Sequence, residues 1–104
     1  MPSFSVRCVF LCAKRSDQTA RHLYEERVTL WEAEDIDQAI AFAEEEAKRY
    51  AADQDQYLGL AQAYALYDQV AATGVEVFSL MRNSDLDAES YLSTFFATGK
   101  ERSW

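Results

Sequence analysis

The sequence has little of what recognisable active sites require. Its 104 residues include three glycines, at positions 59, 74 and 99, which lie too far apart to form a phosphate-binding loop. The single histidine, His22, stands in no HExxH pattern, and a lone histidine of this kind is usually only solvated. The cysteines and serines form no nucleophile motif. We therefore predict a protein that is not an enzyme and that has no catalytic, cofactor-binding or metal-binding residues.

Cysteine is also scarce, with Cys8 and Cys12 as the two examples. On the strand expected for this stretch the two cysteines share a face, and their Cα atoms are about 13 Å apart. That distance is too long for a disulfide. No second Cys/His group accompanies them, as a zinc site would require. Two buried thiols in a reducing compartment are the expected interpretation. The chain shows no signal-peptide pattern and no apolar run of membrane-spanning length, so we expect a cytoplasmic protein without membrane association.

Basic side chains are few, with 10 Lys and Arg against 18 Asp and Glu and a formal net charge of -8. The negative electrostatic field of so acidic a chain repels the phosphate backbones of nucleic acids, so we predict no binding to nucleic acid. The charge suits a basic protein partner or serves solubility alone, which is the commoner case. Hydrophobic residues make up 49% of the chain, enough for one buried core. We predict that residues 1–104 form a single domain.

The clearest local signal is an amphipathic helix between Glu34 and Asp53. Asp35 and Gln38 have the spacing of a capping box, in which two side chains satisfy the first backbone donors of the helix. Apolar residues then recur on one face at helical spacing, namely Ile36, Ala39, Ile40, Ala43, Ala47 and Tyr50. We expect this face to pack against a sheet.

Three further stretches have the alternating pattern of strands, at residues 4–12, 22–33 and 75–81. We assign Phe78 in the last of them to the core. Residues 56–68 are ambiguous, because their Ala, Leu and Gln content favours a helix while their alternation of bulky and small residues favours a strand. Gly59 disfavours a helix interior, so we choose the strand. A second helix is expected from Leu86, capped by Asp87, to just before Gly99.

The element order ββαββα predicts an α+β fold. We expect a two-layer sandwich with a mainly antiparallel four-stranded sheet and both helices on one face. The other face would be uncovered, and a broad apolar face on so small a domain is usually covered by a partner. If the first two strands form a hairpin, Arg7, Glu25 and Arg27 would surround Trp31 as a polar ring around an aromatic anchor. The interface candidates are Arg7, Val9, Leu11, Glu25, Arg27, Trp31 and Trp104.

Glu26 is the one residue out of pattern on the second strand, because it lies in line with Tyr24, Val28 and Leu30. It either occupies the solvated end of the strand or pairs with a cation or a ligand.

Several motifs in combination resemble a family of small bacterial domains of unknown function. They are Tyr24-Glu-Glu-Arg-Val-Thr-Leu-Trp, the Ala/Glu-rich helix, Tyr57-Leu-Gly-Leu-Ala-Gln-Ala-Tyr, Glu76-Val-Phe-Ser-Leu, and Ser84-Asp-Leu with the following Tyr91-Leu, Phe95-Phe and Thr98-Gly. The resemblance runs through most of the chain. It implies a bacterial, single-domain, intracellular protein, and it brings no catalytic residues to this sequence.

Three functions follow from these patterns. The first is a non-catalytic interaction module that self-associates, as a homodimer, through the uncovered sheet face. The second is an immunity or antidote-type protein whose acidic surface neutralises a basic partner. The third is a binder of a small ligand at Arg7, Glu25 and Arg27.

Overall fold

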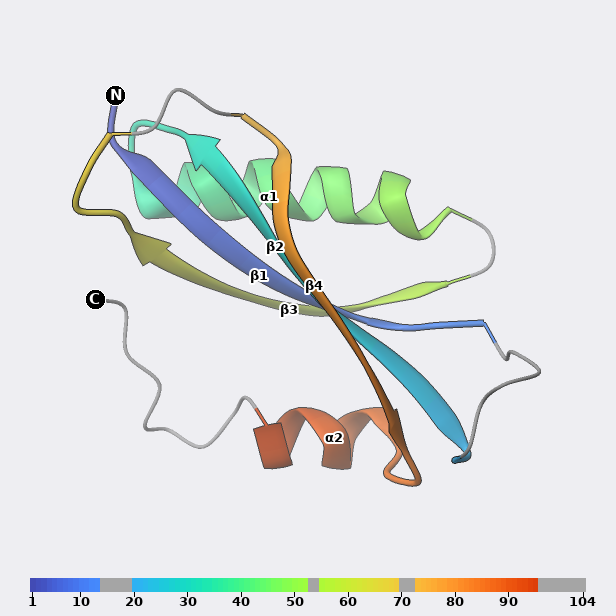
Figure 1. The fold of residues 1–104 in the computed structure, drawn as a ribbon. Coiled ribbons are helices and arrows are strands. Elements are labelled where there is room, and N and C mark those ends of the chain that lie inside the picture. The colour runs from blue at the N-terminus through green and yellow to red at the C-terminus, as the bar shows by residue number, and fades with distance from the viewer. Residues whose placement is uncertain (14–19, 53–54, 70–72, 96–104) are drawn as a thin grey trace.

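The computed structural model describes residues 1–13, 20–52, 55–69 and 73–95. The elements are β1 (Ser3–Leu11), β2 (His22–Glu32), α1 (Ile36–Ala51), β3 (Gln56–Ala65), β4 (Val75–Ser84) and α2 (Ala88–Phe95). The four strands form one sheet in the order β3-β1-β2-β4, and every neighbouring pair is antiparallel (Figure 1). The predicted α+β class, the order ββαββα and the four-stranded antiparallel sheet are confirmed.

The two helices lie on opposite faces of the sheet (Figure 1). The core beneath α1 includes Phe10 of β1, whereas Tyr91 of α2 packs with Val9 and Tyr24. Val9 and Phe10 are neighbours on one strand and so point to opposite faces. The prediction that both helices cover one face is therefore wrong. The physical reason is that β1 carries apolar side chains on both faces, and each face needs a cover.

Helix α1 begins as its sequence indicates. The Gln38 N–H donates to Asp35 Oδ1 at 2.8 Å, and the Glu34 N–H donates to Gln38 Oε1 at 2.7 Å. In a capping box the second bond is donated by the N–H of the cap residue itself, whereas here it is donated by the N–H of the residue before the cap. The residues that α1 buries are all alanines, namely Ala39, Ala43, Ala47 and Ala51. Ala61 and Ala63 of β3 pack against the same core, so small residues from both layers allow the helix to approach the sheet closely.

The ambiguous stretch is a strand, as we chose. Its pairing with β1 is irregular, because Ala61 opposes Cys8 while Tyr57 opposes Phe10. Two more residues of β3 than of β1 lie between these pairs, which is a bulge-type irregularity. Gly59 lies within it at φ +79°, in the left-handed region that glycine adopts without a steric penalty. Gly59, which disfavours a helix in the sequence, therefore allows the backbone conformation that the irregularity in the strand requires.

Strand β4 lies at one edge of the sheet, and Phe78 on it is 52% exposed. Its assignment to the core is wrong. Phe78 opposes Val28 and so faces the α2 side of the sheet, where the residues that pack with Tyr91 of α2 do not include it. An alternating apolar strand outside the reach of the covering helix keeps its side chains in solvent.

Neither of the described helices is both long enough and apolar enough to cross a membrane.

Candidate functional site

The register between β1 and β2 places the residues of the predicted polar ring on different faces of the sheet. Arg27 opposes Cys8, whereas Arg7 opposes Val28. Odd-numbered residues of β1 therefore share a face with even-numbered residues of β2. The prediction that Arg7, Glu25 and Arg27 lie together around Trp31 is wrong, because Glu25, Arg27 and Trp31 face α1 while Arg7 faces the other side.

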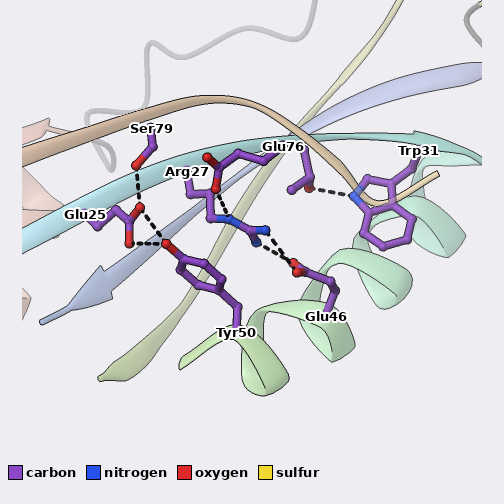
Figure 2. Close-up of polar contacts among 8 residues, drawn as sticks. Glu25, Arg27, Trp31, Glu46, Tyr50, Glu76 and Ser79 are labelled. Atoms are coloured by element: carbon purple, nitrogen blue, oxygen red, sulfur yellow. Dashed lines mark hydrogen bonds and ion pairs between the residues drawn. The ribbon is translucent and has the colours of Figure 1, made fainter. Parts of the chain in front are cut away.

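On the α1 side, buried Arg27 is the centre of a partly exposed ionic cluster (Figure 2). Its guanidinium binds Glu46 of α1 through two bonds, Nη1 to Oε1 at 2.5 Å and Nη2 to Oε2 at 3.0 Å. Its Nε donates to Glu76 Oε1 of β4 at 2.5 Å. The guanidinium carbon also lies 3.8 Å from the ring centre of Tyr50, a cation–π contact. One side chain of β2 thus connects α1 to the edge strand.

Glu25 is buried beside this cluster and accepts hydrogen bonds from two hydroxyl groups. The Tyr50 hydroxyl lies 3.0 and 2.9 Å from its two carboxylate oxygens, and the Ser79 hydroxyl donates to Oε2. Burial raises the pKa of Tyr50 to about 12, and the hydrogen bond to Glu25 acts in the same direction. Tyr50 therefore stays a protonated donor at neutral pH, and the Glu25 carboxylate is held by hydroxyl groups from α1 and β4.

Trp31 belongs to the core and is 8% exposed. Its indole Nε1 donates to Thr29 Oγ1 at 2.6 Å, the bond drawn from Trp31 in Figure 2. The ring centre of Phe42, on α1, lies 6.0 Å from that of Trp31. A Cβ at Gly74 would come within 3.2 Å of its ring, so this loop residue also packs closely on the indole. The prediction that Trp31 is an exposed anchor for a partner is therefore wrong.

On the opposite face, buried Glu26 pairs with cations, which settles the two interpretations of its role. Arg82 Nη1 of β4 lies 3.1 Å from Oε2, and Arg7 Nη1 lies 3.7 Å from Oε1. The Tyr91 hydroxyl of α2 donates to Oε2 at 2.9 Å. The ring of Tyr91 stacks on Tyr24 with centres 3.8 Å apart. These contacts fix α2 to the sheet.

Helix α2 covers only part of this face. Val9 is fully buried and Leu11 is partly buried around the Tyr91 cluster, so neither forms the broad open patch that we predicted. Elsewhere on the face is an open hollow of about 190 Å³. Its lining residues are Ser5, Arg7, Val28 and Tyr64. Trp104, the last interface candidate, lies outside the described residues.

The exposed apolar side chains gather instead on β4. Five of its residues are between 37% and 53% exposed, namely Val75, Val77, Phe78, Leu80 and Met81. Sequence reasoning missed this surface because the alternation in residues 75–81 matches that of a buried strand equally well. The order of strands in the sheet decides between the two, and no local signal gives that order.

The described residues contain no group of three or more His, Cys, Asp or Glu side chains that could hold a metal ion. Cys8 and Cys12 are free and buried. Burial raises the pKa of the Cys8 thiol to about 11, against a hydrogen bond to Tyr57 that lowers it.

This raised pKa predicts a loss of stability in alkali. A thiol whose pKa is 9.0 unfolded and about 11 folded stabilises the fold fully below pH 9 and progressively less as the pH rises to 11. The loss should approach about 3 kcal/mol over that window. Urea titrations at pH 8, 9 and 10 should show the decline, and Cys8→Ala should flatten it. An unchanged slope in that variant would contradict the assignment to Cys8.

Comparison with known proteins adds no relative, since no family model, curated protein or solved structure matches this chain. The resemblance to small bacterial domains stays a prediction.

Proposed function

We propose that this protein is a non-catalytic interaction module that binds a second copy of itself through strand β4. The observation that carries the proposal is that five apolar side chains are exposed on β4, an edge strand of the sheet, three of which, Val75, Phe78 and Leu80, share the α2-side face. Monomeric proteins rarely leave so many large apolar side chains of one strand in solvent, and association with a second copy would bury them.

The pairing of the buried charged residues in the described part of the chain supports the non-catalytic part. Glu25, Glu26 and Arg27, the buried charged residues of the described chain, are all engaged by opposite charges or hydroxyl groups. Such pairing is typical of groups that hold a fold together rather than of a poised acid or base. The two free buried thiols favour a reducing compartment, and the cytoplasm is therefore part of the proposal.

The size of the patch indicates a weak dimer. The exposed apolar surface of β4 is confined to five side chains, each between 37% and 53% exposed, so the contact between two copies is small. Apolar contact of this extent is compatible with association at micromolar concentration.

The test is the mass in solution. Light scattering coupled to size exclusion at 100 μM should report a dimer, and Phe78→Lys should yield a folded monomer because it places a charge in the patch. The matched control is Tyr67→Lys, which changes a fully exposed aromatic residue outside β4 and should leave the dimer intact.

A wild-type protein that stays monomeric under these conditions would contradict self-association. In that case a basic protein partner at β4 and a small ligand in the hollow beside Arg7 are the functions to test next.

A further inference from the structure

We infer that self-association inserts Phe78 of each copy into the open hollow of about 190 Å³ on the α2-side face of the other copy. This inference rests on the proposed self-association and specifies its contact. It starts from a juxtaposition, because an exposed aromatic side chain and a hollow large enough for its ring lie on the same face of one sheet. The lining residues of the hollow are Ser5, Arg7, Val28 and Tyr64.

The register of the sheet places Phe78 and the hollow in one row across the strands. Phe78 opposes Val28, and Val28 opposes Arg7. Opposed residues in an antiparallel pair share a face, so these side chains of β4, β2 and β1 point to the same side. In the next row Ser5 of β1 opposes Tyr64 of β3. The walls of the hollow therefore come from β1, β2 and β3, and Phe78 stands beside it on β4.

Phe78 does not fill the hollow of its own chain. Its side chain is 52% exposed, and the residues that line the hollow do not include it. Strand β1, which supplies two of the walls, lies two strands away from β4, at roughly 10 Å. The described residues that pack around Tyr91 under α2 include neither Phe78 nor any residue of the hollow. The ring therefore reaches a hollow only on a molecule that faces it.

A two-fold axis makes this contact reciprocal. Val28 lies on β2, between the strand that carries Phe78 and the strand at the centre of the hollow. An axis parallel to the strands and above Val28 exchanges the two sides, so that each Phe78 faces the hollow of the other copy. Val28 of one copy then faces Val28 of the other. The two sheets form an aligned sandwich, in which side chains of the inner faces interdigitate.

The hollow suits an aromatic ring in size and in chemistry. A cavity of roughly 150 Å³ holds one benzene ring, and the hollow measures about 190 Å³. Val28 supplies an apolar wall and Tyr64 an aromatic one. The guanidinium of Arg7 attracts the face of an aromatic ring. Arg7 keeps its contacts with Gln62 and Glu26, because a cation–π contact uses the charge of the guanidinium and needs no further donor.

The distribution of charge also favours this face in a chain of net charge -8. The charged strand residues on the α2-side face are balanced, with two of each sign, namely Arg7, Arg82, Glu26 and Glu32. Helix α1, which covers the other face, has four acidic residues against two basic ones, namely Asp37, Glu44, Glu45, Glu46, Lys48 and Arg49. Two copies therefore repel each other less across the α2-side face than across α1.

Ser5→Trp tests the contact, because it fills the hollow without changing β4. This variant should weaken self-association by about tenfold or more, since the ring of Phe78 can no longer be buried there. Phe78→Ala should weaken it to a similar extent. Two matched controls should leave the dimer unchanged. Ser5→Ala keeps the hollow open, and Tyr67→Ala removes a fully exposed aromatic side chain outside β4.

A mixture of the two weakened variants tests the reciprocal geometry. In a heterodimer of Ser5→Trp with Phe78→Ala, the intact Phe78 of the first chain faces the open hollow of the second. The filled hollow of the first chain faces only alanine. One of the two contacts is regained, so native mass spectrometry should find the heterodimer in excess of both homodimers. A dimer in which Phe78 met Phe78 across the axis would show no such excess.

An isotope-filtered NMR experiment tests the same contact in the wild type, without any substitution. A mixture of labelled and unlabelled chains should show a nuclear Overhauser effect between the Phe78 ring of one copy and Ser5 of the other. Ser5 lies two strands away from Phe78 within its own chain, so this signal identifies the second copy. The measurement decides the inference also if Ser5→Trp does not fold.

The outcomes separate the inference from the proposal on which it rests. A dimer that persists in folded Ser5→Trp, a mixture without excess heterodimer, or a wild-type dimer without the signal between Phe78 and Ser5 would overturn insertion into the hollow while self-association stands. A monomeric wild type would overturn both.

Discussion

Replacing Arg27 by alanine should lower the free energy of unfolding by about 3 kcal/mol, one of the two largest effects that we expect from a single substitution. The guanidinium lies between Glu46 and Glu76 and covers the Tyr50 ring. Its removal leaves two carboxylates facing each other across a partly buried space. Because their side chains are 21% and 40% exposed, water screens part of this repulsion, and we expect the lower end of the range for a broken buried ion pair. Urea denaturation measures the effect.

Further variants of the cluster separate charge from packing. Arg27→Met with Glu46→Gln and Glu76→Gln keeps most of the volume and removes the unpaired charges, so it should recover part of the loss. Arg49→Ala, on the exposed side of α1, is the control and should change stability by at most about 0.5 kcal/mol. A cost of Arg27→Ala below about 1 kcal/mol would mean that the cluster does not stabilise the fold.

Tyr91→Ala should cost about 3–5 kcal/mol, as do other deletions of buried aromatic rings. Tyr91 is fully buried and supplies the stack on Tyr24 and the hydrogen bond to Glu26. A helix of eight residues is not stable in isolation, so α2 depends on this contact. We expect α2 to leave the sheet in this variant, with faster hydrogen exchange of its amides and dye binding to the exposed apolar face.

Tyr91→Phe distinguishes the ring from its hydroxyl. It keeps the stack and removes only the donor to Glu26, which retains Arg82, so the cost should be about 1–2 kcal/mol. Thr94→Ala, on the exposed side of α2, should have almost no effect. Equal losses in Tyr91→Phe and Tyr91→Ala would show that the ring packing contributes little.

The two clusters also connect these stability effects to the proposed association. Arg27 holds the N-terminal half of β4 from the α1 side, and Glu26 holds its C-terminal half from the α2 side. Loss of the Arg27 contact should loosen the edge strand, so Arg27→Ala should weaken the dimer as well as the fold.

The local elements of this protein were determined by sequence alone. The cap at Asp35, the alanine face of α1 and the small face of β3 are patterns within a few residues, and propensity and spacing are local properties. The same holds for the order ββαββα. Burial of Cys8 and Cys12 followed from their place on the apolar side of one strand.

The tertiary structure decided which surfaces are inside. Alternation shows which residues of one strand share a face. The register between strands decides which residues of the neighbouring strand lie on that same face. One step of register placed Glu25, Arg27 and Trp31 under α1, away from Arg7. Strand order likewise made β4 an edge, so that Phe78 lies in solvent although its sequence matches that of a core strand. Both register and order arise from contacts between residues far apart in the chain, which no pattern within a single segment specifies.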